Sequence, residues 1–195
     1  IACSPKLIPL FARSFPRAEI EPDEPSRHEA RGDIDYHLPM GDLFRFLRPD
    51  IPSFRGGKAY LFADPGRVES WRERLAALGP GPKLGLSWRS GRLSVARSRH
   101  FAVHLLEMKC LLAVTGPVFI ALQYGQTEAE LAETERMLGI RIHRFPDLDL
   151  FDDLDELAAL LTALDLLIGV GTATDMLAAA LGTPLWQSCI DDARW

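Results

Sequence analysis

Through residues 83–190 the chain alternates short apolar segments with longer amphipathic ones. Five apolar segments have the length of strands: 84–88, 118–122, 140–143, 166–170 and 184–188. The second is apolar at every position, as expected for a strand covered on both faces. Between the strands, apolar residues recur three and four positions apart, which is the spacing of a helix face. This alternation predicts an α/β fold with a parallel sheet wrapped by helices.

Helix boundaries are marked by their own signals. Three residues that favour helix starts are followed three positions later by an acidic residue, which is the pattern of a capping box: Thr127 with Glu130, Asp153 with Glu156, and Thr172 with Asp175. Gly139 and Gly182 are placed to end two of these helices. We therefore expect side-chain caps at all three helix starts.

A break in the chain divides this region from the residues before it. Asp64 and Pro65 favour the start of a helix, and the sequence Gly-Pro-Gly-Pro at 79–82 then interrupts regular structure. Further upstream, 5–13 has a helical pattern, 18–20 a strand pattern, and 21–33 is charged and contains proline. We expect residues 1–78 to be part of one domain with a connecting helix, and 83–195 to form a second, α/β domain.

Composition excludes several classes. The 195 residues carry 22 basic and 27 acidic side chains, a net charge of −5, which argues against binding of nucleic acid through phosphate neutralisation. No apolar run approaches the ~20 residues of a membrane span, and no signal peptide is expected. The three cysteines, Cys3, Cys110 and Cys189, lack metal or disulfide spacing. A reducing, cytoplasmic location is the default expectation.

Candidate phosphate-binding groups follow the first and fourth predicted strands, where ligands bind in an open parallel sheet. After the first come Ser87, Arg89, Ser90 and Gly91, with more arginines beyond. Guanidinium groups pair with phosphate oxygens, but a solvated basic loop has the same composition. After the fourth, 171–173 (Gly-Thr-Ala) opens a helix whose N-terminus suits a pyrophosphate. The alternative is that its threonine only caps the helix.

The end of the second predicted strand offers groups for a nucleobase. Gln123 and Tyr124 place an amide and an aromatic ring there, although a tyrosine at a strand end is more often a packing residue. Six carboxylates between 147 and 156 have no histidine or asparagine interleaved at ligand spacing, and the five histidines form no metal motif, so no metal is expected. Residues 169–174 also resemble a dinucleotide fingerprint, with Thr174 in place of its third small residue. This leaves an NAD-type oxidoreductase as one alternative.

The order of these loops resembles a known family. The segments that carry the resemblance are 83–91 (KLGLSWRSG), 119–125 (FIALQYG), 145–149 (FPDLD), 172–186 ending in GTPLW, and 7–16 upstream. Together they resemble the glycosyltransferase-like domain that follows tetratricopeptide repeats in bacterial proteins. That domain is related to the heptosyltransferases and more remotely to O-linked N-acetylglucosamine transferases.

The resemblance implies a GT-B architecture, in which two Rossmann-like domains face each other across a cleft. Residues 83–195 would be the donor domain that holds a nucleotide-diphosphate sugar, and 1–78 the end of the acceptor domain. The phosphates would lie near Ser87, Arg89 and Thr172, and the base or ribose near Gln123 and Tyr124. Transfer to a hydroxyl of a protein or glycan acceptor would need no metal or other cofactor, and tetratricopeptide repeats would precede the domain in a longer protein.

The resemblance is incomplete at the phosphate loop. Heptosyltransferases have an Asp-Thr-Gly run there and a histidine three residues later, where this chain has Gly171, Thr172, Ala173 and Met176. The missing acid and imidazole leave open whether the parent protein is an active enzyme. A second hypothesis is therefore a catalytically degenerate module that serves as a scaffold or protein-interaction domain.

Overall fold

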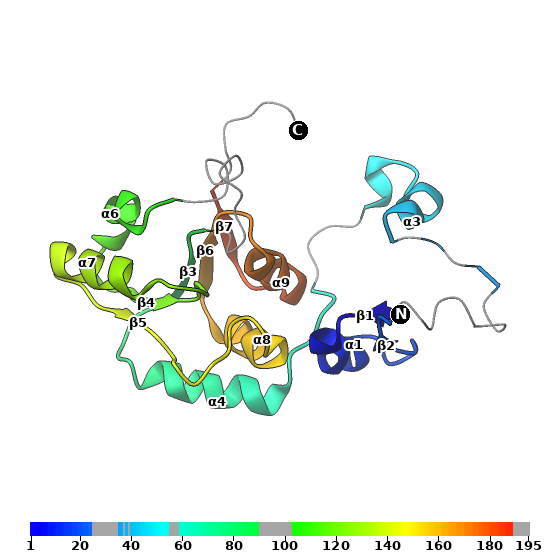
Figure 1. Cartoon of the computed structure of the whole chain (residues 1–195), viewed down its shortest axis with the longest axis horizontal. Helices are drawn as coiled ribbons and strands as arrows, with labels where there is room; N and C mark the ends of the chain where they lie inside the picture. The colour runs from blue at the N-terminus through cyan, green and yellow to red at the C-terminus, as the bar shows by residue number, and fades with distance from the viewer. Residues whose placement is uncertain (25–34, 37, 39, 55–58, 90–102, 189–195) are drawn as a thin grey trace.

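The fold is described by a computed structural model for residues 1–24, 35–36, 38, 40–54, 59–89 and 103–188. Its main body is a five-stranded sheet of β3 (Lys83–Ser87), β4 (Val118–Ala121), β5 (Ile142–His143), β6 (Leu166–Gly169) and β7 (Leu185–Gln187). The strands lie in the order β5-β4-β3-β6-β7, and each neighbouring pair is parallel (Figure 1). The predicted α/β fold is confirmed, and its strand order is Rossmann-like.

Helices cover both faces of the sheet. One apolar core joins the sheet to η3 (Leu105–Met108), α6 (Lys109–Leu112) and α7 (Glu128–Leu138). The other joins it to α4 (Pro65–Ala76), α8 (Leu154–Ala163) and α9 (Ala173–Leu181), and Figure 1 shows α4 lying along α8. The helix predicted to connect the two domains, α4, thus shares the core of the α/β body.

Strand β3 is in the centre of the sheet and its sequence is adapted to that position. It begins one residue earlier than predicted, since Lys83 pairs with Val118 of β4. The Lys83 ammonium donates to the carbonyl oxygens of Gly79 (2.6 Å) and Gly81 (2.8 Å). Gly85 has no room for a side chain, since a Cβ there would lie 2.7 Å from Leu164 and 2.8 Å from Leu122. The helices on this face can therefore approach the sheet closely.

The N-terminal residues form a small unit beside α8. It comprises β1 (Ala2–Cys3), η1 (Pro5–Leu7), α1 (Ile8–Ser14) and β2 (Glu21–Pro22). The strand expected at 18–20 forms instead at β2, which pairs in parallel with β1. Leu10 is fully buried in the core shared with α8, and Arg13 donates to the Asp155 carboxylate at 2.9 Å.

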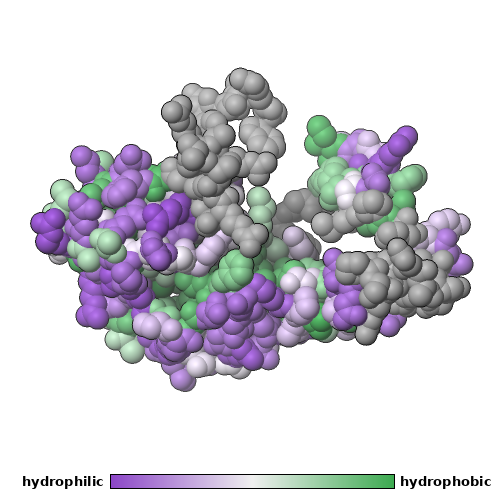
Figure 2. Space-filling model, viewed as in Figure 1, coloured by the Kyte–Doolittle hydropathy of each residue, from purple (hydrophilic) through white to green (hydrophobic). Residues whose placement is uncertain are grey.

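A second segment upstream of α4 is largely exposed. It contains α3 (Met40–Leu47) and η2 (Ile51–Ser53), and Figure 2 shows hydrophobic residues gathered around α3. Its exposed apolar side chains are Leu43, Phe44, Phe46, Leu47, Ile51 and Phe54. No element was predicted for these residues.

The three predicted capping boxes have three different outcomes. Asp153 caps α8 by accepting from the Glu156 N–H at 3.0 Å. At α7 the prediction is wrong: Thr127 makes no side-chain capping bond, and the Glu130 carboxylate bonds to Arg89 and Leu105 instead of to the helix start. At α9 the direction is reversed, since the Thr172 hydroxyl donates to the Asp175 carboxylate at 2.9 Å instead of accepting from a helix N–H.

Candidate functional site at the carboxyl ends of the strands

The direction in which successive strands are added to the sheet changes between β3 and β6. Successive strands are added on one side of β3 as far as β5, and the chain then crosses to build β6 and β7 on the other. In open α/β sheets a crevice forms at this point, outside the carboxyl ends of the strands. Ser87 ends β3 and Thr172 follows β6, and their hydroxyl oxygens are 3.1 Å apart. Two of the residues predicted to bind phosphate are therefore in contact.

A carboxylate already occupies the start of α9. Asp175 is fully buried, accepts from the Gly171 N–H at 2.6 Å and from the Thr172 hydroxyl at 2.9 Å, and lies over Gly169. A Cβ at Gly169 would be 2.2 Å from that carboxylate. The Gly171 N–H and the Thr172 hydroxyl, which the sequence predicts to bind a phosphate, are thus bonded to the carboxylate of Asp175. Ala173, the third predicted residue of this loop, is the first residue of α9.

Arg89, the predicted partner of the diphosphate, points toward α7. Its guanidinium bonds to the Glu130 carboxylate at 2.6 Å and to the Gln126 carbonyl oxygen at 2.8 Å. Glu130 is buried and also accepts from the Leu105 N–H at 2.8 Å, which ties η3 to the same group. The Arg89 charge is therefore largely balanced within the protein. Ser90 and Gly91 lie outside the described residues.

Gln123 has a structural role that the sequence did not indicate. Its side chain is buried, and its amide oxygen accepts from the N–H groups of Trp88 (3.1 Å) and Arg89 (2.8 Å). The amide nitrogen donates to the Tyr124 carbonyl oxygen at 3.3 Å. This side chain fixes the loop after β3 to the end of β4, and reading a base with it would break those bonds.

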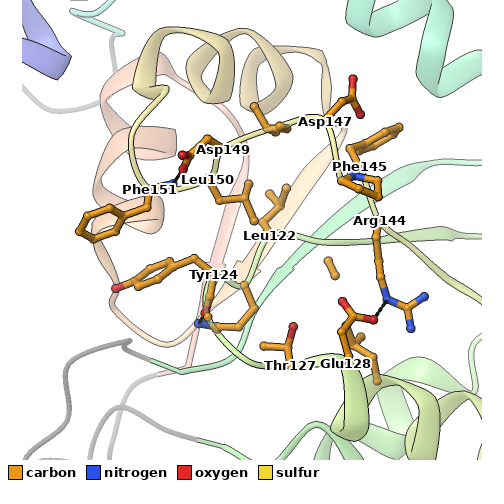
Figure 3. Close-up of a pocket in the computed structure, with 16 residues that line it drawn as sticks. Leu122, Tyr124, Thr127, Glu128, Arg144, Phe145, Asp147, Asp149, Leu150 and Phe151 are labelled. Carbon is orange, nitrogen blue, oxygen red and sulfur yellow. Dashed lines mark hydrogen bonds and ion pairs between the residues drawn. The ribbon is translucent and has the colours of Figure 1, made fainter.

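A pocket of about 860 Å³ opens at the ends of β4 and β5, beside this crevice. Its floor and walls include Leu122, Leu150 and Tyr124, and the Tyr124 ring lies 5.6 Å from that of Phe151 (Figure 3). Tyr124 thus lines a pocket at the end of β4, and its binding of a base stays a prediction. The pocket is large enough for a nucleoside, and its aromatic and aliphatic walls suit a planar ring.

The loop that forms one wall of the pocket is fixed from two sides. Arg74 of α4 stacks on Phe145, 4.8 Å from the ring centre, and donates to Asp147 at 2.9 Å. Lys6 lies 3.9 Å from the centre of the Phe151 ring and bonds to the carbonyl oxygen of that residue at 3.2 Å. These cation–π contacts and hydrogen bonds tie the wall to α4 and to the N-terminal unit.

Two carboxylates at this wall are held ionised. The hydrogen bond from Arg74 lowers the pKa of Asp147 below its usual value. Backbone N–H groups of Asp152 and Phe151 lower the pKa of Asp149 in the same way. The sequence analysis treated the six carboxylates between 147 and 156 only as unsuited to a metal, and it did not indicate the pocket. The signal was present in Phe145 and Phe151, two large aromatic residues that flank these acids just after a predicted strand.

Two features are absent from the described part of the chain. Within it, no three histidine, cysteine or acidic side chains are grouped so that they could hold a metal ion. Likewise, none of its helices is long and apolar enough to cross a membrane.

The fold and the crevice together define a Rossmann-like α/β domain. Among curated proteins, the chain is similar to Protein FlbA of Caulobacter vibrioides, with 40% identity over 199 aligned residues. That alignment covers 96% of this chain and 33% of FlbA, so the chain spans about a third of its relative's length. No family model and no solved structure matches the chain.

Proposed function

We propose that this chain binds the nucleotide diphosphate of a sugar donor, as the donor domain of a GT-B-type glycosyltransferase-like protein. The observation that carries the proposal is the crevice at the reversal of strand order, where Ser87 and Thr172 meet, next to a pocket walled by Tyr124. Crevice and pocket lie on the same edge of the sheet, as the phosphates and base of one ligand require.

The roles of the side chains follow from this placement. The base enters the pocket against Tyr124, and the diphosphate lies toward Ser87 and Thr172. A guanidinium has five N–H donors, so Arg89 retains donors beyond those bonded to Glu130 and Gln126. Fixed donors of this kind stabilise a departing diphosphate without a metal. In the longer protein the sugar passes to a hydroxyl of a protein or glycan acceptor, in a chain that also carries tetratricopeptide repeats.

Thermal unfolding with UDP-, GDP-, ADP- and CMP-sugars tests the proposal. A ligand at 100 times its dissociation constant adds about 2.7 kcal/mol to the stability, which raises the melting temperature by several degrees. Arg89→Ala reduces the shift. The matched control is Arg72→Ala, which removes an exposed arginine of α4 that pairs with Glu69 one turn away. No shift with any of the four donors contradicts the proposal.

A specific observation favours a second function, a degenerate module that acts through protein contacts. The carboxylates of Asp175 and Glu130 already bond to Gly171, Thr172 and Arg89, the groups expected to hold phosphate. This alternative predicts that none of the sugar nucleotides changes the melting temperature of the native chain. It is excluded if a sugar nucleotide stabilises the native chain and Arg89→Ala weakens that effect.

A further inference from the structure

Lys6 belongs to the N-terminal unit, yet it contacts the wall of the pocket. Its ammonium lies 3.9 Å from the centre of the Phe151 ring, donates to the Phe151 carbonyl oxygen at 3.2 Å and pairs with the Asp152 carboxylate. One cation from η1 thus holds both the ring and the backbone of an aromatic residue 145 positions later in the chain. Phe151 is 48% exposed, so packing covers only part of this residue. The contact with Lys6 supplies a restraint that packing does not.

Phe151 in turn contacts Tyr124 at one end of the pocket. The two ring centres are 5.6 Å apart and the ring planes are inclined by 52°, a geometry within the range of attractive aromatic pairs. Both residues line the pocket, and Figure 3 shows the two rings side by side, although they come from the segments that follow β4 and β5. A series of contacts therefore runs from Lys6 through Phe151 to Tyr124, the residue against which we place the base.

The N-terminal unit is itself anchored to the α/β body. Leu10 is fully buried in the core that includes α8, and Arg13 donates to the Asp155 carboxylate at 2.9 Å. Lys6 therefore extends from a fixed element. A side chain that must become ordered when a ligand binds reduces the affinity, whereas a side chain that is already in place does not. Holding the aromatic pair before the ligand arrives therefore favours the stacking of a planar base.

We propose that Lys6 is a positioning residue of the nucleotide pocket, which holds the Phe151 ring against Tyr124 and so strengthens binding of the base. The inference rests on the proposed nucleotide-binding function. It adds to that site a residue from the segment 1–78, which the sequence assigned to another domain. Lys6 acts through Phe151, so its effect on binding depends on the aromatic ring as well as on the charge.

Titration calorimetry of the 195-residue chain with UDP, GDP, ADP and CDP tests this, using the nucleotide that binds tightest. Lys6→Met keeps an unbranched side chain and removes the charge, and it should weaken binding about two- to fivefold, as expected for loss of an exposed cation–π contact. Lys6→Arg should restore the affinity, because a guanidinium also stacks on an aromatic face. Lys109→Met is the matched control, since it removes an exposed lysine of α6 on the other face of the sheet, and it should leave the affinity unchanged.

A double-mutant cycle separates action through the ring from simple attraction of an anionic nucleotide. Phe151→Leu removes the ring and keeps an apolar wall, and in that background Lys6→Met should no longer change the affinity. An equal loss with and without the ring overturns the inference and leaves the nucleotide site standing, as does an unchanged affinity in Lys6→Met or a failure of Lys6→Arg to restore binding.

The same titrations distinguish failure of the inference from failure of the proposed function. If none of the four nucleotides binds the native chain, both fail. Circular dichroism checks the fold of each variant. Should Lys6→Met not fold, Lys6→Gln takes its place with the same expected loss, and the same outcomes overturn the inference.

Discussion

Replacing Gly169 by alanine tests the packing at the start of α9. The added methyl carbon would lie 2.2 Å from the Asp175 carboxylate, which must move away from the Gly171 N–H and the Thr172 hydroxyl. Overpacking costs about 1–3 kcal/mol, and a hydrogen bond to a charged group contributes about 1.5–3 kcal/mol. Because the carboxylate can shift in part, we expect a loss of about 3 kcal/mol in the free energy of unfolding.

A double-mutant cycle isolates the cause of that loss. In an Asp175→Ala background the methyl group has room, and Gly169→Ala should be neutral or stabilising by up to about 1 kcal/mol through the unfolded state. Urea unfolding followed by circular dichroism gives the four free energies. Gly41→Ala is the control, because a Cβ there meets no atom within 4 Å. A loss that is the same with and without Asp175 refutes the reasoning.

Three further predictions concern stability. Gly85→Ala should cost about 1–3 kcal/mol in urea unfolding, because its Cβ would overlap two leucine side chains. Gln123→Leu should cost about 2–4 kcal/mol, since it leaves the N–H groups of Trp88 and Arg89 unpaired. Because the pKa of Asp149 is lowered in the folded protein, its ionised carboxylate stabilises the fold at pH values above the pKa of an unfolded aspartate, which is about 4. The melting temperature should therefore fall as the pH drops below about 4, and it should fall less steeply in Asp149→Asn.

The sequence predicted the sheet well because its signals are local. Each strand is a short apolar run between helix boundary residues, and the alternation requires parallel strands whatever the details of packing. The ends of the strands were predicted less exactly than their existence. Lys83 is charged and was left out of the first strand, yet its ammonium is satisfied by carbonyl oxygens that only the folded loop at 79–82 provides.

The candidate site was predicted only in part, for a physical reason. Polar side chains choose among partners that the fold brings together, and sequence spacing shows only the local ones. Glu130 lies at the right spacing to cap α7 but bonds to Arg89, 41 positions away in the sequence. Gln123 looked available for a base, yet it holds the loop after β3. Thr127 was predicted to cap a helix and is instead directed into the pocket.

The central claim is that a nucleotide binds at the carboxyl ends of the strands. Backbone hydrogen–deuterium exchange tests it most directly, with and without the sugar nucleotide that gives the largest thermal shift. We predict slower exchange at 122–127, 144–151 and 171–174, and unchanged exchange in the exposed helix α3. Exchange that stays the same in all three loops, or slows only elsewhere in the chain, contradicts the claim.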